Sequence, residues 1–229
     1  MSAEIQVLSS IATREAYLEL VPQFERASGH RIATTWAGTV DIMKRMAAGE
    51  VHDVVIISSH ELDELIRQGK IEAGSRIDVA NSGIGVCVRT GAPRPDVSSA
   101  DALKRTLLAA TTVGYTSGPS GVYMAGLIER MGIADQIKSK YRSVPSGGTI
   151  GTIVASGECE IGFQQVSELV HIKGTDYVGP LPPDLQRVTV FASGIQVGAG
   201  NAEAAKALDQ FLTTPAAMAA MKRHGLEAG

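Results

Sequence analysis

The sequence has few cysteines, few aromatic residues and no cluster of histidines, and each shortage excludes a class of protein. Two cysteines in 229 residues, Cys87 and Cys159, cannot form a disulfide framework, and each is expected inside or beside a strand as a small apolar residue. The five histidines are scattered and no CxxC or HExxH pattern occurs, so no metal site is expected. Only ten residues are aromatic, which disfavours a sugar or nucleobase site built on stacked rings.

Long apolar runs and nucleotide-binding motifs are also missing. No run approaches the ~20 apolar residues that cross a bilayer, so no membrane insertion is expected. No GxxxxGK[ST] run occurs, and the segment 83–85 lacks the third glycine of a dinucleotide fingerprint. The segment 118–121 is not a GxSxG motif, so a nucleophilic serine is not expected either. No cofactor is therefore predicted.

The charge balance points away from nucleic acids. The chain has 21 Lys and Arg against 24 Asp and Glu, a net charge of -3, which argues against a protein that binds phosphate backbones. Hydrophobic residues make up 44% of the chain and charged residues 20%, which is typical of a folded globular protein. The first four residues are polar and lead directly into a strand-like segment, so no signal peptide is expected. We expect a periplasmic protein if a leader has been removed, and a cytoplasmic one if the chain is native as it stands.

Strand-like and helix-like segments alternate along the chain, a pattern typical of an α/β fold with mainly parallel sheets and helices on both faces. Strands are expected over residues 5–8, 31–36, 53–57, 84–89, 112–115, 142–144, 161–163 and 188–197. A first helix carries Tyr17, Leu20, Val21 and Phe24 on one face, and Pro22 is expected to kink or split it. Further helices are expected over residues 41–48, 61–68, 99–108, 120–131, 135–141, 149–156, 202–212 and 215–224.

The order of these elements predicts two lobes. The pattern of strands restarts near residue 84, and the long strand-like run near 188–198 leads back to two closing helices. A chain that leaves one lobe, builds a second and returns crosses between them twice. We therefore expect lobe 1 over residues 1–81 and 190–229, lobe 2 over 82–189, a double hinge near 80–82 and 187–189, and a ligand cleft between the lobes.

Four strand-to-helix junctions are rich in glycine and small polar residues: 9–13, 37–40, 116–121 and 145–149. Ligands of open α/β sheets bind outside the carboxyl ends of the strands, where helix N-termini present unpaired N–H groups and a positive dipole end. With two junctions in each lobe, the pattern predicts a site for a small anion without lysine or metal. The candidate ligand-binding residues are Ser9, Ser10, Thr13, Arg14, Thr39, Ser120, Gly121, Gly147 and Gly148.

A plainer interpretation stays open at each junction. Ser, Thr and Gly at such places are also ordinary helix caps and turns. Arg14 is a candidate because a cation at a helix start opposes the dipole, although most arginines there lie on the surface. No residue is assigned a catalytic role, and His60 and Tyr123 are kept only as weak candidates for proton transfer.

The order of elements, together with several short segments, resembles the periplasmic molybdate-binding proteins, a branch of the type 2 periplasmic solute-binding proteins. The similarity covers nearly the whole chain. The segments that carry it are Gln23-Phe24-Glu25, Ala37-Gly38-Thr39, Ala48-Gly49, the strand 53–58, Pro119-Ser120-Gly121-Val122-Tyr123, Glu160-Ile161-Gly162-Phe163 and the ending 211–217.

The resemblance implies a two-lobed type 2 periplasmic-binding-protein fold and an oxyanion held by hydroxyl and backbone N–H groups. By position, Thr39 matches a hydroxyl ligand, and Ser120 and Gly147 match backbone donors. Two positions depart from the family pattern: Ala12 stands at the first-loop serine, and Gln165 stands where a tyrosine hydroxyl is expected. These departures leave a planar or branched carboxylate, hydrogen-bonded by Gln164 or Gln165 and paired with Arg14, as open as molybdate, and Gln165 is a further candidate ligand-binding residue.

Two functions follow from the resemblance. The first is a monomeric solute-binding protein that closes over a small anion and delivers it to the permease of an ABC importer. The second is an isomerase of a small tricarboxylate on the same scaffold, because the aconitate isomerases resemble this family. Cytoplasmic sensing or storage of an anion is a third reading. The first is favoured, so the chain is expected more as a binding protein than as an enzyme.

Overall fold

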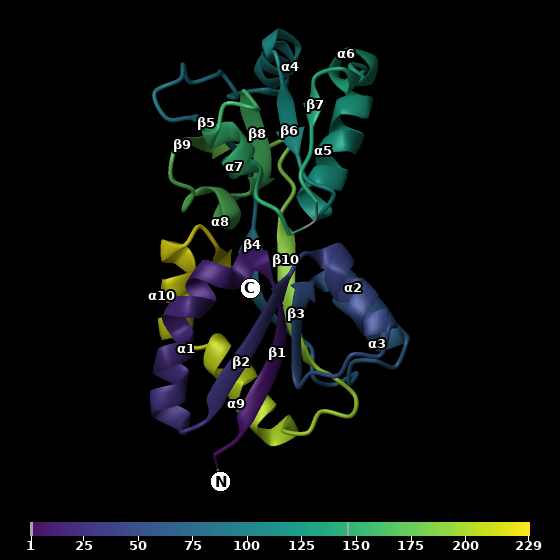
Figure 1. The fold of residues 1–229 in the computed structure, drawn as a ribbon, viewed down its shortest axis with the longest axis vertical. Coiled ribbons are helices and arrows are strands. Elements are labelled where there is room, and N and C mark those ends of the chain that lie inside the picture. Colours follow the sequence, from purple (N-terminus) through teal and green to yellow (C-terminus); the bar gives the residue numbers. More distant parts are fainter. Residues whose placement is uncertain (1, 146) are drawn as a thin grey trace. The chain divides into compact units, whose positions relative to one another are not determined.

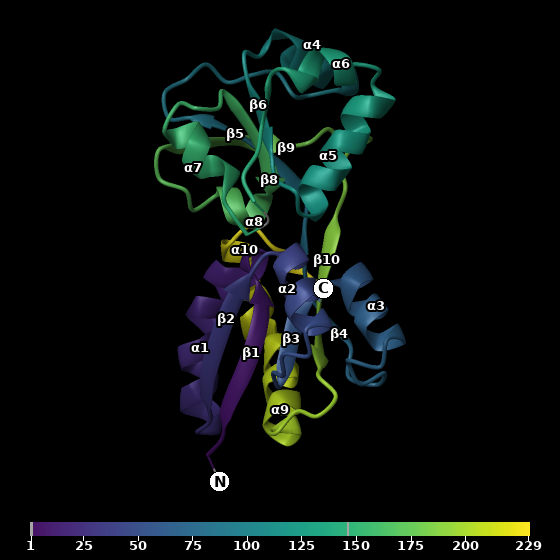
Figure 2. The same ribbon diagram turned by 45° about the vertical axis from the view of Figure 1, so that its right-hand side comes forward.

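The chain divides into two units, each with its own sheet and core. In the computed structural model, which describes residues 2–145 and 147–229, unit 1 comprises residues up to Ser82 together with Thr189–Gly229, and unit 2 comprises Gly83–Val188 (Figures 1 and 2). Ser82 and Thr189, the residues of unit 1 nearest the two crossings, are paired on neighbouring strands. The two segments that connect unit 1 to unit 2 therefore leave unit 1 from adjacent strands of its sheet.

Unit 1 contains a six-stranded sheet in the order β11-β4-β10-β3-β1-β2. Its strands are β1 (Glu4–Ser10), β2 (Arg31–Ala37), β3 (Val54–Ser58), β4 (Ile77–Ser82), β10 (Thr189–Ile195) and β11 (Glu227–Ala228). β1 runs parallel to β2 and to β3, whereas β10 is antiparallel to β3 and β4. The three parallel strands thus have their carboxyl ends at one edge of the sheet.

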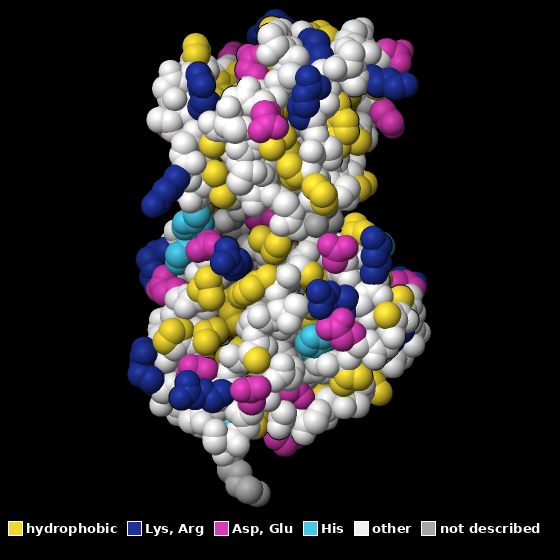
Figure 3. Space-filling view, in the orientation of Figure 1, with side chains coloured by type: hydrophobic (Ala, Val, Ile, Leu, Met, Phe, Trp, Pro, Cys, Tyr) yellow, Lys and Arg dark blue, Asp and Glu magenta, His cyan; other side chains and the backbone are white. Residues whose placement is uncertain are grey.

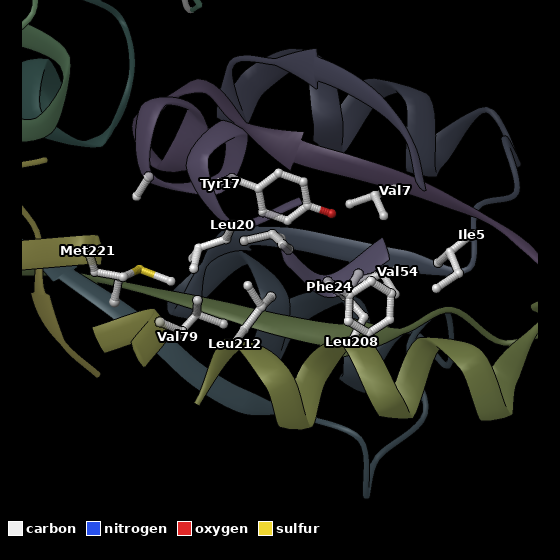
Figure 4. Packing of buried hydrophobic residues seen from close by; sticks show 14 of the residues in the cluster. Ile5, Val7, Tyr17, Leu20, Phe24, Val54, Val79, Leu208, Leu212 and Met221 are labelled. Carbon is white, nitrogen blue, oxygen red and sulfur yellow. The ribbon is translucent and has the colours of Figure 1, made fainter. Parts of the chain in front are cut away.

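Helices cover both faces of this sheet. They are α1 (Arg14–Ser28), α9 (Ala202–Leu212) and α10 (Pro215–Arg223) on one face, and α2 (Thr39–Ala47) and α3 (Ser59–Arg67) on the other. Strand β3 shows why a continuous apolar run is needed: Val54 and Ile56 pack with the first group of helices (Figure 4), and Val55 and Ile57 with the second. A strand that is buried on both faces has no position for a polar side chain.

Unit 2 repeats this plan with a five-stranded sheet in the order β7-β6-β8-β5-β9. Its strands are β5 (Ile84–Arg89), β6 (Val113–Tyr115), β7 (Tyr141–Arg142), β8 (Ile161–Gln165) and β9 (Thr175–Pro180). Its helices are α4 (Ala100–Ala109), α5 (Pro119–Arg130) and α6 (Ala134–Lys138) over one core, and α7 (Ile150–Ala155) and α8 (Val166–Leu169) over the other. Cys87 on β5 and Cys159 just before β8 are both buried and free, as expected.

The α/β fold and its helices on both faces are confirmed, but the prediction of mainly parallel sheets is wrong, and of the two outcomes expected at Pro22, a kink or a split, the split is wrong. The sheets are mixed: β6 is parallel to β7 and β8, while β5 is antiparallel to both β8 and β9. Pro22 does not split α1, which runs unbroken over Arg14–Ser28. Pro22 and Leu18, whose carbonyl loses its intrahelical donor, both lie on the exposed side of the helix, where water replaces the missing bond.

Several elements were absent from the prediction. β4, β9 and α8 lie in segments that had no expected element, and Tyr141 belongs to a strand instead of a helix. In the described part of the chain, no helix is long and apolar enough to cross a membrane.

One carboxyl group is buried in the core of unit 1. Asp209 on α9 is 5% exposed, and Ser193 Oγ on β10 donates to its Oδ1 at 2.6 Å. Burial raises the pKa of Asp209 from 3.8 to about 7, and the Ser193 hydrogen bond offsets only part of that rise. Ionisation of this group therefore opposes folding.

The substitution Asp209→Asn should change how stability depends on pH. Because the folded pKa of Asp209 lies above its unfolded value, the stability that the protonated group provides is complete below about pH 4 and is lost as the pH rises to about 7. Each pKa unit corresponds to about 1.4 kcal/mol, so the variant should be more stable than the wild type at pH 8 by up to about 4 kcal/mol. Urea unfolding at pH 4.5 and pH 8 measures this difference. Asp184→Asn, at an exposed position, serves as the control, and a parallel pH dependence in wild type and Asp209→Asn would contradict the assignment.

Candidate functional site

In unit 1, the residues predicted at the first junction form a small buried network at the carboxyl end of β1. The short 3-10 helix Ile11–Thr13 connects β1 to α1. Thr13 Oγ1 donates to the Ser10 carbonyl at 3.0 Å, so Ser9 Oγ, which lies 3.0 Å from Thr13 Oγ1, is the donor in that contact. The Ser10 hydroxyl accepts from the Ala12 N–H at 3.4 Å. All three side chains are buried, and they hold the turn in shape.

The second junction of unit 1 lies at the same edge of the sheet. Ser10, at the end of β1, is in register with Ala37, at the end of the parallel strand β2. Gly38 is the N-cap of α2, and its carbonyl accepts from the N–H groups of Asp41 and Ile42. Thr39, the first residue of α2, is buried, and its hydroxyl makes no hydrogen bond to another described residue. The Thr39 hydroxyl is therefore available to donate a hydrogen bond to a ligand.

Arg14 does not join this network. It is the first residue of α1, its side chain is half exposed, and its guanidinium pairs with Glu15 at 3.5 Å. An exposed pair of this kind contributes little energy. The predicted junctions of unit 1 therefore place neutral polar groups at this edge of the sheet. Arg14, the cation predicted there, is paired with Glu15 instead.

In unit 2, the two predicted junctions also meet at one edge, because they follow β6 and β7, which are parallel, with Gly114 in register with Arg142. After β6, the N–H of Gly118 donates to Thr116 Oγ1 at 3.2 Å, and α5 then begins at Pro119. Ser120 is buried in the first turn of α5, and its hydroxyl has no hydrogen-bond partner among the described residues.

Gly121 allows this turn to close. A Cβ at this position would lie 1.6 Å from the carbonyl oxygen of Thr116, a separation that no side chain tolerates. The glycine therefore permits the loop after β6 to fold tightly against the start of α5, which places the N–H groups of that first turn at the edge of the sheet.

The last junction, 145–149, is held by a glutamine side chain. Gly147 has a φ of +88°, which favours glycine, and the N–H of Gly148 donates to the Pro145 carbonyl at 2.8 Å. Gln164 on β8 accepts from the N–H of Ile150 at 2.7 Å and donates to the Gly148 carbonyl at 3.1 Å. Ser146, which also belongs to this junction, lies outside the described residues.

The remaining candidates lie in different settings. Gln165 is buried at the end of β8, next to Gln164 and at the edge that the two loops share. His60 is exposed in the first turn of α3. The Tyr123 hydroxyl donates to the Leu185 carbonyl at 2.9 Å, and Arg130 lies over its ring. That hydrogen bond gives Tyr123 a structural role in unit 2.

One residue at the edge of unit 2, Glu168, was missed in the sequence, whereas its partner Gln164 was named there as a candidate hydrogen-bond partner of a carboxylate. Gln164 Nε2 donates to Glu168 Oε1 at 2.8 Å, and Glu168 lies on α8, directly after β8. Burial raises the pKa of Glu168 to about 7, partly offset by the Gln164 hydrogen bond. In the sequence, this pair shows only as a glutamine four residues before a glutamate. That spacing becomes informative once strand β8 is known to end between the two residues.

The described residues contain no group of three or more His, Cys, Asp or Glu side chains that could hold a metal ion. On the face of the molecule drawn in Figure 3, basic and acidic side chains are interspersed. The predicted junctions at these edges offer mainly hydroxyl, amide and backbone groups, and ionisable side chains that follow the parallel strands include His60 and Glu61 in unit 1 and Glu168 in unit 2. Hydroxyl, amide and backbone N–H groups donate hydrogen bonds to an anion of modest size.

Comparison with known proteins agrees with this architecture. The family described as bacterial extracellular solute-binding protein matches residues 5–227. An aconitate isomerase from Pseudomonas sp is 35% identical, with 97% of this chain and 87% of that protein aligned. The molybdate-binding protein ModA of Azotobacter vinelandii is 25% identical over 98% of this chain and 90% of its own.

A solved structure shows the same fold. The periplasmic molybdate-binding protein of Azotobacter vinelandii superimposes with a TM-score of 0.83 at 16% sequence identity, covering 98% of this chain and 99% of that one. The expected resemblance to molybdate-binding-like solute-binding proteins and the expected fold class are confirmed by these matches.

The substitution Gly121→Ala should destabilise the protein, because the new Cβ would meet a backbone oxygen that cannot move without opening the turn. Strain of this kind costs at least about 2 kcal/mol, which lowers the melting temperature by several degrees. Gly126→Ala is the matched control on the same helix, since a Cβ there meets only the flexible end of Arg130 at 3.4 Å. The control should gain up to about 1 kcal/mol from helix propensity. Equal melting temperatures for the two variants would show that the turn is not tight.

Proposed function

We propose that this chain, which belongs to the family of bacterial extracellular solute-binding proteins, binds a small anion through hydroxyl and backbone N–H groups of both units. The observation that supports this most directly is the placement of the loops. In each unit, two loops that lead into helices begin at the shared carboxyl edge of parallel strands. Each unit thereby offers a cluster of donors instead of a single one.

The helices α1, α2 and α5 supply the electrostatic part of the argument. Their first turns present N–H groups without intrahelical acceptors, and the positive ends of their dipoles lie at these edges. Each dipole contributes typically 0.3–1 kcal/mol, roughly, toward a nearby negative charge, and more when the site is partly buried. Thr39 and Ser120 add hydroxyls that have no other described partner.

The ligand we propose is a molybdate-like oxyanion or a small carboxylate, and the residues favour the carboxylate. Relatives named as molybdate-binding proteins share the fold. The resemblance to that family implies a serine in the first loop and a tyrosine after the late strand, but this chain has Ala12 and Gln165 at those positions. Gln165, at the end of β8, carries a side-chain amide, and such N–H donors suit a carboxylate, which accepts hydrogen bonds in one plane. The proposal includes a periplasmic location for the chain and delivery of the anion to the permease of an ABC importer.

A second candidate is the isomerisation of a small tricarboxylate. It is favoured by the 35% identical relative named aconitate isomerase, which aligns over nearly the whole chain. Shifting a double bond between two carbons requires one group that removes a proton and returns it at the other end of the allylic system. Neither the exposed His60 nor Tyr123, whose hydroxyl is bonded to Leu185, is well placed for that task.

A panel of anions tests the proposed binding and separates the two candidates. Molybdate, tungstate, sulfate, citrate, and cis- and trans-aconitate are each added in a thermal melt. A true ligand at 100 times its Kd stabilises the fold by about 2.7 kcal/mol, which is a readily measured shift. We expect the aconitates or citrate to give the largest shift, and ultraviolet absorbance of aconitate incubated with the protein reports isomerisation. If every anion leaves the melting temperature unchanged, the anion-binding proposal is wrong.

The substitution Thr39→Val should weaken binding of the anion that gives the largest shift, with little effect on the fold. A hydrogen bond to a charged group contributes about 1.5–3 kcal/mol, so the affinity should fall by roughly 10- to 100-fold. Isothermal titration calorimetry measures the Kd. Thr213→Val is the control, because that exposed hydroxyl donates only to the carbonyl of Gln210. An unchanged affinity in Thr39→Val would remove Thr39 from the site.

A further inference from the structure

The Gln164–Glu168 pair forms the inner support of the anion-binding loop of unit 2. Gln164 makes three hydrogen bonds: it accepts from the N–H of Ile150, and it donates to the Gly148 carbonyl and to Glu168 Oε1. Because the N–H of Ile150 is a donor, the amide oxygen must face it, and the amide nitrogen must face the other two groups. The orientation of the amide is therefore determined by its partners.

Glu168 is held at this position by its place in the chain. It lies on α8, which begins directly after the last residue of β8, at the edge that also receives the loop after β6. Its carboxylate is one hydrogen bond away from the side chain that fixes residues 148–150. A charge on Glu168 thus lies at the same edge as the donors we assign to the anion.

The causes of the raised pKa of Glu168 include no charged side chain among the described residues. Burial raises this pKa to about 7, opposed only by the Gln164 hydrogen bond. Helix α8 packs against β5, β8 and β9, and the titratable group that approaches it is Tyr177 of β9, whose ring adjoins Gly85 and whose pKa is raised by burial. His171 and Lys173 follow α8 in the next loop.

We propose that Glu168 couples anion binding to proton uptake, so that the site takes an anion and a proton together. This inference rests on the proposed anion-binding function. An ionised Glu168 repels an anion at the same edge, and protonation removes that repulsion. The Gln164 amide keeps its acceptor in both states, because a protonated carboxyl group retains a carbonyl oxygen. The loop is therefore held in place while the charge changes.

The sign of the pH dependence follows directly. Below the pH at which Glu168 titrates, the group is neutral and the anion binds at full affinity. Above it, each binding event must also bind a proton, so the affinity falls by up to tenfold for each pH unit. A ligand that titrates in the same range would confuse the measurement, and sulfate and molybdate are therefore used beside trans-aconitate.

The experiment compares the wild type with Glu168→Gln by isothermal titration calorimetry between pH 6 and pH 8.5. Titrations in buffers with different ionisation enthalpies give the number of protons taken up with each anion. The wild type should take up nearly one proton at pH 8 and lose about tenfold in affinity between pH 7.5 and pH 8.5. Glu168→Gln should take up none and keep a constant affinity, as a permanently neutral isostere.

Asp209→Asn is the matched control, because Asp209 is the other carboxyl group whose pKa burial raises to about 7, and it lies in the core of unit 1. It should retain the proton uptake of the wild type. A pH slope that persists in Glu168→Gln, or disappears in Asp209→Asn, would overturn the inference. Proton uptake in the wild type needs no variant, so its absence at pH 8 overturns the inference even if Glu168→Gln fails to fold.

Failure of the underlying function gives a different result. If none of the three anions produces heat or a thermal shift at any pH, the anion-binding proposal fails, and the inference on Glu168 fails with it. Binding without a pH slope, in contrast, leaves the proposed function intact and removes only the role of Glu168. Glu168→Asp, which retains the charge on a shorter side chain, should keep a pH slope.

Discussion

The parallel pairing of a few strands determines where every candidate group of this protein lies. β1 and β2 run side by side in unit 1, and β6 and β8 do so in unit 2, so loops that are far apart in the sequence begin at a common edge. The helices that follow turn back along the sheet, because their apolar faces pack on it. Their first turns must then lie at that edge. The topology thus places the groups that we propose for an anion, and the local residues decide only which of these groups stay available.

Serine and threonine residues that look alike in the sequence differ in whether their hydroxyls are already hydrogen-bonded within the protein. The Ser9 hydroxyl donates to the Thr13 hydroxyl, which donates to the backbone of the turn, and the Ser10 hydroxyl accepts from the Ala12 N–H. Thr39 and Ser120 are equally buried, yet their hydroxyls have no described partner. The first group makes the turn rigid, and the second offers donors that need not break a bond to reach a ligand. Preorganisation of this kind lowers the cost of ordering the site on binding.

The elements that could be predicted from the sequence are those whose burial leaves a regular pattern. β3 is apolar throughout because both of its faces are covered, and α1 shows a helical stripe that tolerates Pro22 on its exposed side. β9 was missed because every one of its residues is partly or fully exposed, so no alternation marks it. The directions of β5 and β10 depend on how the chain re-enters each unit, which no local pattern encodes.

The candidate site shows the same division. Its loops could be found from glycine and hydroxyl residues at strand ends, whereas Glu168 could not, because α8 is only four residues long and gives no periodic signal. That residue nevertheless changes the electrostatics at the edge of unit 2. Arg14, the cation expected at the edge of unit 1, is half exposed and paired with Glu15. Helix termini attract an anion through partial charges. One ionised carboxyl group at the same edge repels that anion about as strongly as two or three helix termini attract it. Under our proposal, protonation of Glu168 removes this repulsion at the edge of unit 2.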